Sequence, residues 1–152
     1  RPLGTGGSII NAINTLNINE PFMVVNADTW LGNGLKKLSL SSPNTIAAVK
    51  VKDCSRYGAL KVENMKIIQI LEKKSSNKGG LINAGLYHLS PNIFMDFLGR
   101  ASFSLEDDVF PVVVDRDTLF AIEIDSDFID IGVPKDYFKF CKWIESGKKI
   151  EL

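Results

Sequence analysis

Short apolar runs and helix-spaced apolar positions alternate over the first third of the chain. A glycine-rich turn at residues 4–7 precedes residues 8–16, whose apolar side chains fall at helical spacing: Ile9, Ile10, Ile13 and Leu16. Phe22–Val25 is apolar throughout and Thr45–Val51 is rich in β-branched residues, so both predict strands. Residues 35–40 predict a short helix between them. This alternation favours an α/β fold.

A hairpin pattern interrupts that alternation in the middle of the chain. Residues 58–62 and Lys66–Leu71 predict two short strands joined by a three-residue connection, which favours antiparallel pairing. Residues 81–89 are another apolar run and predict a further strand. A hairpin added to helical crossovers predicts a mixed sheet flanked by helices.

The C-terminal part predicts further helices and strands. Ser90 and Pro91 suit the start of a helix, whose predicted buried face is Phe94, Phe97 and Leu98. Residues 104–114 predict another helix, and residues 119–124 and 128–131 predict late strands. Pro134 begins a predicted amphipathic helix with four side chains facing inward: Tyr137, Phe140, Cys141 and Ile144.

Composition narrows the class of protein. The 152 residues are 45% hydrophobic, which suits one compact domain over residues 1–152. Lys plus Arg and Asp plus Glu both number 18, so no net charge attracts nucleic acid or an anionic membrane. Cys54 and Cys141 follow no disulfide or zinc pattern, which predicts a cytoplasmic protein. No apolar run approaches the roughly 20 residues that span a bilayer, which predicts a soluble one. Because Arg1 stands where Met is usual, we expect the chain to be incomplete at its N-terminus.

Two acidic residues are candidates for a metal site. Asp28 follows the apolar run Phe22–Val25, and Asp130 lies inside the apolar stretch 128–132. A carboxylate in such surroundings needs a partner, because burying a lone charge is costly. If the two converge, their oxygens suit Mg²⁺, which takes one or two carboxylates and completes its shell with phosphate and water. The alternative is structural, with each Asp capping a neighbouring turn.

Other polar residues allow a functional and a structural interpretation. A lysine of Glu72-Lys73-Lys74, after the strand Lys66–Leu71, could meet a phosphate, or the three residues could form a solvated charged turn. Asn83-Ala84-Gly85 interrupts an apolar strand, which indicates either a ligand close to the backbone or a bulge. His88 suits a packed residue better than a catalytic base, and no Ser/His/Asp or Cys/His nucleophile set can be argued.

A series of motifs, taken in order, resembles the sugar-phosphate nucleotidyltransferases. The motifs are Pro2-Leu3-Gly4-Thr5-Gly6-Gly7, Asn26-Ala27-Asp28, Ser55-Arg56-Tyr57-Gly58, Glu72-Lys73, Ile82-Asn83-Ala84-Gly85-Leu86-Tyr87, Phe103-Ser104-Leu105-Glu106 and Phe128-Ile129-Asp130-Ile131-Gly132-Val133-Pro134. Within that family the strings are most similar to guanylyltransferases acting on D-glycero-D-manno-heptose 1-phosphate. The resemblance covers the whole chain and implies a GT-A-like, Rossmann-like fold of the nucleotide-diphospho-sugar transferase type.

The resemblance also implies a role for individual residues. Asp28 and Asp130 correspond to the metal carboxylates, and together with Lys73 they form the catalytic set. The nucleotide-binding positions are Gly4, Thr5, Gly6, Gly7 and Asn26, with Gly6 and Gly7 against the base. The sugar-phosphate pocket corresponds to Tyr57, Gly58, Glu72, Lys73 and Asn83. Glu72 and Asn83 would contact sugar hydroxyls, Lys73 would hold the phosphate, and Tyr57 would form a wall.

The implied reaction needs no covalent intermediate. A sugar 1-phosphate oxygen attacks the α-phosphorus of a nucleoside triphosphate, GTP by the resemblance, and pyrophosphate leaves. The two substrates are both anions, so positioning and charge neutralisation by Mg²⁺ and lysine should provide most of the catalysis. This chemistry agrees with the lack of a recognisable nucleophile.

The chain departs from the family pattern in three places. No Gly-Gly-x-Gly-Thr-Arg-Leu loop precedes Arg1, so we expect the 152 residues alone to turn over poorly. The strand that normally precedes that loop is also missing, which predicts an exposed sheet edge and possible homo-oligomers. Ala27 replaces a usual Gly and Lys74 a usual Pro. These departures keep a non-catalytic sugar-nucleotide-binding or assembly subunit open as an alternative.

A glycosyltransferase of similar fold is the other alternative. Such enzymes commonly carry an Asp-x-Asp pair at the strand tip, whereas Asn26-Ala27-Asp28-Thr29 has a single acid. The prediction is therefore a nucleotidyltransferase with a nucleoside triphosphate and a sugar 1-phosphate as partners.

Overall fold

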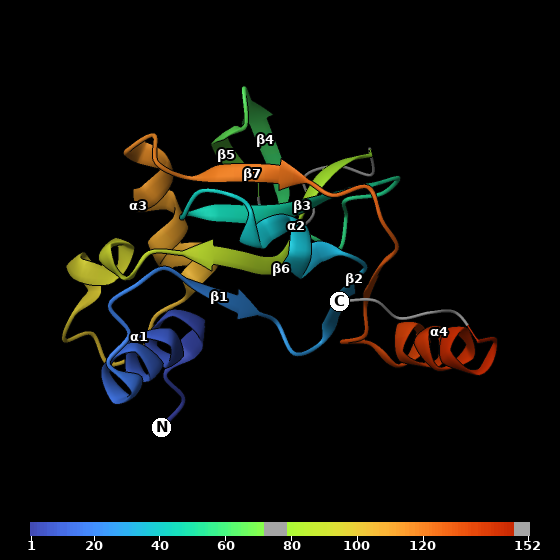
Figure 1. Ribbon diagram of the computed structural model, residues 1–152, viewed down its shortest axis with the longest axis horizontal. Helices are drawn as coiled ribbons and strands as arrows, with labels where there is room; N and C mark the ends of the chain where they lie inside the picture. Colours follow the sequence, from blue (N-terminus) through green and yellow to red (C-terminus); the bar gives the residue numbers. More distant parts are fainter. Residues whose placement is uncertain (72–78, 148–152) are drawn as a thin grey trace.

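The computed structural model describes residues 1–71 and 79–147, which form a mixed α/β structure (Figure 1). Six strands make one sheet in the order β1-β6-β3-β7-β5-β4. Their bounds are Phe22–Val25 (β1), Thr45–Val51 (β3), Ala59–Glu63 (β4), Lys66–Leu71 (β5), Gly80–Leu89 (β6) and Phe120–Glu123 (β7). β3 and β7 are parallel, whereas the other neighbours are antiparallel, so the mixed sheet and the β4–β5 hairpin predicted from the sequence are confirmed.

The long strand β6 carries an irregularity in its middle. Along the β3–β6 pair the register shifts between Ile46↔Tyr87 and Ala48↔Asn83, so β6 carries two extra residues here. Gly85 lies inside this bulge with φ +73°, and a Cβ there would come within 2.9 Å of the Asn26 amide nitrogen. Both the left-handed backbone and the close approach require glycine. The bulge brings β6 against the turn that follows β1.

The sheet is buried on both faces. Along β3, Ile46 and Ala48 belong to one apolar cluster and Ala47 and Val49 to the other. The first cluster is covered by α1 (Gly4–Leu16), the 3₁₀ helix η1 (Pro91–Phe97), the π-helical turn η2 (Leu105–Val109) and α3 (Phe110–Asp115). The second cluster is covered by α2 (Gly34–Ser39) and by Leu31. This burial on both faces explains why β3 is an apolar run rather than an alternating one.

Helix α1 begins at Gly4, so the prediction of a glycine-rich turn at residues 4–7 was wrong. Residues distant in the sequence stabilise the helical conformation of this glycine-rich segment. The backbone N–H groups of Gly6 and Gly7 both donate to the Phe103 carbonyl, and a Cβ on Gly6 would lie 2.3 Å from the Phe103 ring. Packing of Phe103 against this helix turn therefore offsets the low helix propensity of glycine.

A small second sheet joins two distant parts of the chain. β2 (Thr29–Leu31) pairs with β8 (Phe128–Asp130) in antiparallel register, with Thr29 opposite Asp130. β8 was predicted from its apolar pattern, whereas β2 was not. The pairing places the segment after β1 beside the late strand β8.

Two predicted buried faces need correction. Leu98 is 54% exposed, because η1 is a 3₁₀ helix with about three residues per turn, which aligns Phe94 with Phe97 and leaves Leu98 outside. In α4 (Pro134–Glu145), Tyr137 and Ile144 are also exposed. That helix lies at one end of the molecule, where Phe140 and Trp143 make aromatic contacts with the buried Trp30.

The edge of the main sheet is formed by β1. Within the described residues β1 pairs with β6 alone, so its other edge has no strand partner there. The strand Phe22–Val25 is confirmed, but the prediction that it is buried was wrong: three of its residues are half-buried and Val25 is 45% exposed, because the strand lies at the edge of the sheet. Association through this edge stays a prediction, as do the single domain and the cytoplasmic location. None of the helices within residues 1–71 and 79–147 has the length and apolar character needed to cross a bilayer.

Candidate active site

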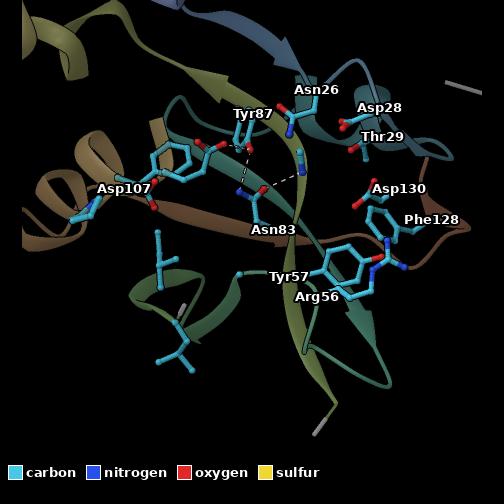
Figure 2. A pocket seen from close by; sticks show the side chains of 17 residues that line it. Asn26, Asp28, Thr29, Arg56, Tyr57, Asn83, Tyr87, Asp107, Phe128 and Asp130 are labelled. Carbon is cyan, nitrogen blue, oxygen red and sulfur yellow. Dashed lines mark hydrogen bonds between the residues drawn. The ribbon is translucent and has the colours of Figure 1, made fainter. Parts of the chain in front are cut away.

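The structure brings the carboxylates of Asp28 and Asp130 together at the β2–β8 pair. Asp28 lies in the turn between β1 and β2, and Asp130 is the last residue of β8. The Ile131 N–H donates to the Asp28 carbonyl over 2.7 Å, which holds the two segments side by side. Figure 2 shows Asp28, Thr29 and Asp130 close together on one side of a cavity. Residues 102 positions apart in the chain thus share one wall.

Gly132 leaves open space between the two carboxylates. A Cβ there would lie 3.0 Å from one oxygen of Asp130 and 3.1 Å from one oxygen of Asp28. Within the described residues no group of three or more His, Cys, Asp and Glu side chains could hold a metal, so this site offers two protein ligands. Mg²⁺ commonly binds through one or two carboxylates and completes its shell with phosphate and water. The donor set therefore fits Mg²⁺ better than a metal that needs a complete protein cage.

The cavity beside these acids has a volume of about 740 Å³ and includes three residues predicted for the sugar-phosphate pocket. The Tyr57 ring stands edge-on to Phe128 at 5.8 Å, and the Asn83 N–H donates to the Gly58 carbonyl over 3.2 Å. We name this space the acidic cavity, because Asp28, Glu106, Asp107 and Asp130 line it. Glu72 and Lys73, predicted for the same pocket, lie outside the described residues.

Arg56 supplies the one cationic side chain in the described part of the acidic cavity's lining. Its guanidinium donates to Asp136 at the start of α4 over 2.6 Å and lies 5.5 Å from the centre of the Tyr57 ring. The hydrogen bond to Asp136 raises the pKa of Arg56. Burial raises the pKa of Tyr57, and the nearby Arg56 charge partly opposes this. The cavity rim therefore holds a permanent cation and a neutral phenol beside the acids.

Asn83 and Tyr87 form a hydrogen-bonded pair on β6 (Figure 2). The Asn83 amide nitrogen donates to the Tyr87 hydroxyl over 3.0 Å, and the Asn83 oxygen accepts from the Gly85 N–H over 2.9 Å. The Tyr87 hydroxyl donates to Glu106 over 3.3 Å. Burial and the Glu106 charge raise the pKa of Tyr87 far above its usual range, so the phenol stays protonated. These contacts fix the rotamer and the amide orientation of Asn83.

A second cavity, of about 570 Å³, lies at the start of α1. We name it the helix-start cavity. Three residues predicted for nucleotide binding line it, namely Gly4, Thr5 and Asn26. Gly6 and Gly7, predicted to lie against the base, are instead buried beside Phe103 and do not line either cavity. Of the residues predicted to bind the nucleotide, three therefore line the helix-start cavity, and two form the contact between α1 and Phe103 instead.

The profile of the family described as "Nucleotidyl transferase" matches residues 1–147. The chain belongs to this family. The α/β fold predicted by resemblance is confirmed by HddC from Yersinia pseudotuberculosis, a crystal structure 37% identical in sequence, with a TM-score of 0.80 over 95% of this chain and 64% of that one. The same protein complexed with GMP-PN gives a TM-score of 0.77.

The curated relatives of the chain include proteins named as sugar-phosphate guanylyltransferases. The chain is 38% identical over 143 residues to D-glycero-alpha-D-manno-heptose 1-phosphate guanylyltransferase of Campylobacter jejuni. It is 34% identical over 143 residues to mannose-1-phosphate guanylyltransferase catalytic subunit beta of Dictyostelium discoideum. These matches cover 91% and 90% of this chain, and the chain spans 62% and 40% of the two relatives.

For this nucleotidyl transferase chain, the residue-level prediction missed several members of the acidic cavity. Thr29, Arg56, Glu106, Asp107 and Phe128 all line it. All five lie in or directly beside the motifs that carry the family resemblance, and that position was the available signal for Arg56 and Glu106. Phe128 was assigned to a strand and to the last motif but was given no role in the site, and its contact with Tyr57 depends on tertiary packing.

Proposed function

We propose that the protein containing this chain transfers a nucleotidyl group from a nucleoside triphosphate to a sugar 1-phosphate and releases pyrophosphate. GTP is the proposed donor and D-glycero-D-manno-heptose 1-phosphate the proposed acceptor. The observation that carries the proposal is the convergence of Asp28 and Asp130 around Gly132, at the cavity that also contains Tyr57, Gly58 and Asn83. Two acids facing one open space suit a divalent cation and phosphate.

The residues of the chain divide the work of this reaction. Asp28 and Asp130 would hold Mg²⁺, which supplies charge neutralisation for phosphate oxygens when bound. Asn83, with its orientation fixed by Tyr87 and Gly85, offers an amide for sugar hydroxyls. Arg56 offers a guanidinium for the acceptor phosphate at the rim. Both substrates are anionic, so their alignment at close range is the main task of the site.

The assignment of the donor rests on the helix-start cavity and on the relatives. Gly4, Thr5 and Asn26 leave room near the backbone at the start of α1, where a nucleotide could contact main-chain groups. HddC was crystallised with GMP-PN, and two curated relatives are named guanylyltransferases. These observations support guanylate as the transferred group. The similarity to the C. jejuni relative supports a heptose acceptor over mannose.

Pyrophosphate release by the complete gene product tests the proposal. GTP with D-glycero-D-manno-heptose 1-phosphate and Mg²⁺ should release pyrophosphate faster than GTP with mannose 1-phosphate or ATP with the same heptose. The nucleotide-sugar product is identified by mass spectrometry. Binding of both ligands without release would favour a sugar-nucleotide-binding subunit instead. Faster release with mannose 1-phosphate would retain nucleotidyl transfer and overturn the heptose assignment.

A further inference from the structure

The acidic cavity and the helix-start cavity share two lining residues, Asn26 and Glu106. Asn26 belongs to the turn that follows β1, whereas Glu106 lies in the first turn of η2. Glu106 therefore borders both the proposed acceptor site and the proposed donor site. The reaction assigned above gives this carboxylate no role.

Three hydroxyl groups from different parts of the chain contact the Glu106 carboxylate. Thr5 donates to Oε2 over 3.0 Å and Ser104 donates to the same oxygen over 3.3 Å. Tyr87 donates to Oε1 over 3.3 Å. One oxygen thus accepts from Thr5, which lines the helix-start cavity, and the other accepts from the buried Tyr87, which is paired with Asn83. A charged acceptor strengthens each of these hydrogen bonds relative to a neutral one.

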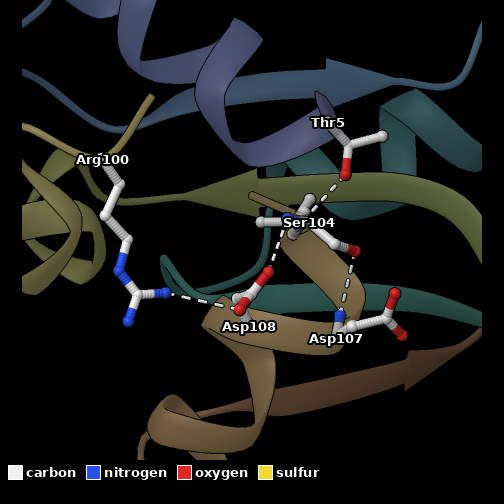
Figure 3. A network of polar contacts seen from close by, with 6 residues as sticks. Thr5, Arg100, Ser104, Asp107 and Asp108 are labelled. Carbon is white, nitrogen blue, oxygen red and sulfur yellow. Dashed lines mark hydrogen bonds and ion pairs between the residues drawn. The ribbon is translucent and has the colours of Figure 1, made fainter. Parts of the chain in front are cut away.

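The start of η2 is itself held by several hydrogen bonds (Figure 3). The Leu105 N–H donates to the Thr5 hydroxyl over 2.8 Å, and the Asp107 N–H donates to the Ser104 hydroxyl over 3.0 Å. Asp108 accepts from the Ser104 N–H over 2.8 Å. Glu106 therefore projects from a fixed backbone. Thr5 contacts both the backbone of this turn and the side chain of Glu106.

These contacts form a continuous hydrogen-bonded series from Thr5 through Glu106 and Tyr87 to Asn83. The separations along it are 3.0, 3.3 and 3.0 Å. Tyr87 and Asn83 have limited freedom, because Tyr87 is 1% exposed and Asn83 is also bonded to Gly85. A displacement of Thr5 changes the donors to Oε2 and thereby the position of the carboxylate that holds Tyr87. Energetic coupling between binding sites requires a physical connection of this kind.

We infer that Glu106 is a positioning residue that couples the two cavities, so that occupation of the helix-start cavity strengthens binding in the acidic cavity. The inference rests on the proposed function for the identity of the two ligands. The Glu106 carboxylate accepts from Thr5 at the nucleotide side and from Tyr87, which in turn fixes Asn83 at the sugar-phosphate side. By linkage, each ligand strengthens the binding of the other by the same factor.

Titration calorimetry with the complete gene product tests the coupling. The dissociation constant of D-glycero-D-manno-heptose 1-phosphate is measured in Mg²⁺ buffer with and without a saturating GTP analogue. In this analogue a methylene group replaces the α,β-bridging oxygen, so that pyrophosphate cannot leave. For the wild type we expect the analogue to strengthen sugar-phosphate binding about tenfold. Glu106→Gln should reduce this ratio to about one. Asp115→Asn makes the same acid-to-amide change at an exposed position at the end of α3 and should keep the wild-type ratio.

Substitutions at Thr5 provide a second test, whose expected result differs from that of a purely structural role of Glu106. Thr5→Val, remote from the acidic cavity, should weaken sugar-phosphate binding in the presence of the analogue about tenfold when Glu106 is intact. In the Glu106→Gln background the same change should have no further effect. Thr5→Ser keeps the hydroxyl and should retain wild-type coupling. If Glu106→Gln fails to fold, Thr5→Val and Tyr87→Phe, compared with Thr5→Ser, still measure the coupling.

The outcomes separate this inference from the proposed function. A wild-type protein that binds both ligands cooperatively but releases no pyrophosphate contradicts the proposed function and retains the coupling. A protein that turns over while Glu106→Gln and Thr5→Val keep the wild-type binding ratio contradicts the coupling alone. Independent binding of the two ligands to the wild type also overturns it.

Discussion

The acidic cavity and the helix-start cavity are built in different ways. The first is lined by four carboxylates and one guanidinium among the described residues, carried by turns and strands from distant parts of the chain. The second is lined mainly by small and apolar side chains around the start of α1, with Glu106 as its acid. One cavity therefore depends on charge, whereas the other depends on how closely side chains approach the backbone.

This difference predicts opposite sensitivities. Removing a carboxylate charge without changing the shape of the side chain should lower activity strongly. The reason is that electrostatic effects are large where a carboxylate, a cation and phosphate groups lie close together. Adding volume should affect the region behind the helix-start cavity, because Phe103 packs there directly on glycine. Changes that alter neither feature should have small effects.

The largest expected effect is the loss of a carboxylate from the acidic cavity. Asp28→Asn and Asp130→Asn should each lower Mg²⁺-dependent kcat/KM by at least about 100-fold, because the amide cannot neutralise a cation. Pyrophosphate release measures the rate, and circular dichroism checks the fold. Asp125→Asn, at an exposed position near β8, serves as the control. Full activity of both site variants would exclude the proposed metal ligands.

Gly6→Ala tests the dependence on volume behind the helix-start cavity. Helix propensity alone favours Ala over Gly by up to about 1 kcal/mol. The Cβ would lie 2.3 Å from the Phe103 ring, so we expect a net loss of about 1–3 kcal/mol in the free energy of unfolding. Urea denaturation measures it. Gly7→Ala meets its nearest atom at 3.2 Å and should lose less. A Gly6→Ala variant more stable than wild type would contradict the packing argument.

Gly132→Ala adds volume to the cavity that depends on charge. Its methyl group would stand 3.0–3.1 Å from oxygens of both Asp130 and Asp28, the two residues proposed to hold the cation. We expect Mg²⁺ affinity to fall about tenfold, with a change in unfolding free energy below about 1 kcal/mol, since position 132 is exposed. A metal titration followed by activity and by calorimetry tests this. An unchanged Mg²⁺ requirement would mean that the cation binds elsewhere.

The smallest expected effect concerns pH and the buried hydroxyl between the cavities. The folded structure raises the pKa of Tyr87 above its ordinary value of 10.0, so the protonated phenol stabilises the fold fully below pH 10. This contribution should decline as pH rises above 10, by less than about 1 kcal/mol at pH 10.5. Denaturation of wild type and Tyr87→Phe at pH 8–10.5 should therefore show curves that converge. Parallel curves would remove Tyr87 as the titrating group.

Much of the fold follows from local patterns. β1 and β3 were predicted with their observed bounds, because an apolar or β-branched run of strand length needs no distant information to be recognised. The turn at Asn64 and Met65, both with positive φ, joins β4 to β5 as the hairpin prediction required. The start of α1 and the exposed face of α4 were mispredicted. Both depend on partners, Phe103 and Trp30, that periodicity does not contain.

The candidate site divides in the same way. Motif order alone identified Asp28, Asp130, Tyr57, Gly58 and Asn83 as members of one site, and the structure brings all five to the acidic cavity. The sequence by itself thus determined which residue types were available and at which strand ends they lie. Only the tertiary structure decided that Gly6 supports Phe103 and that Glu106 contacts Thr5, 101 residues away. Strand and helix patterns arise from neighbours along the chain, whereas a shared carboxylate between two cavities arises from packing of segments that local periodicity cannot relate.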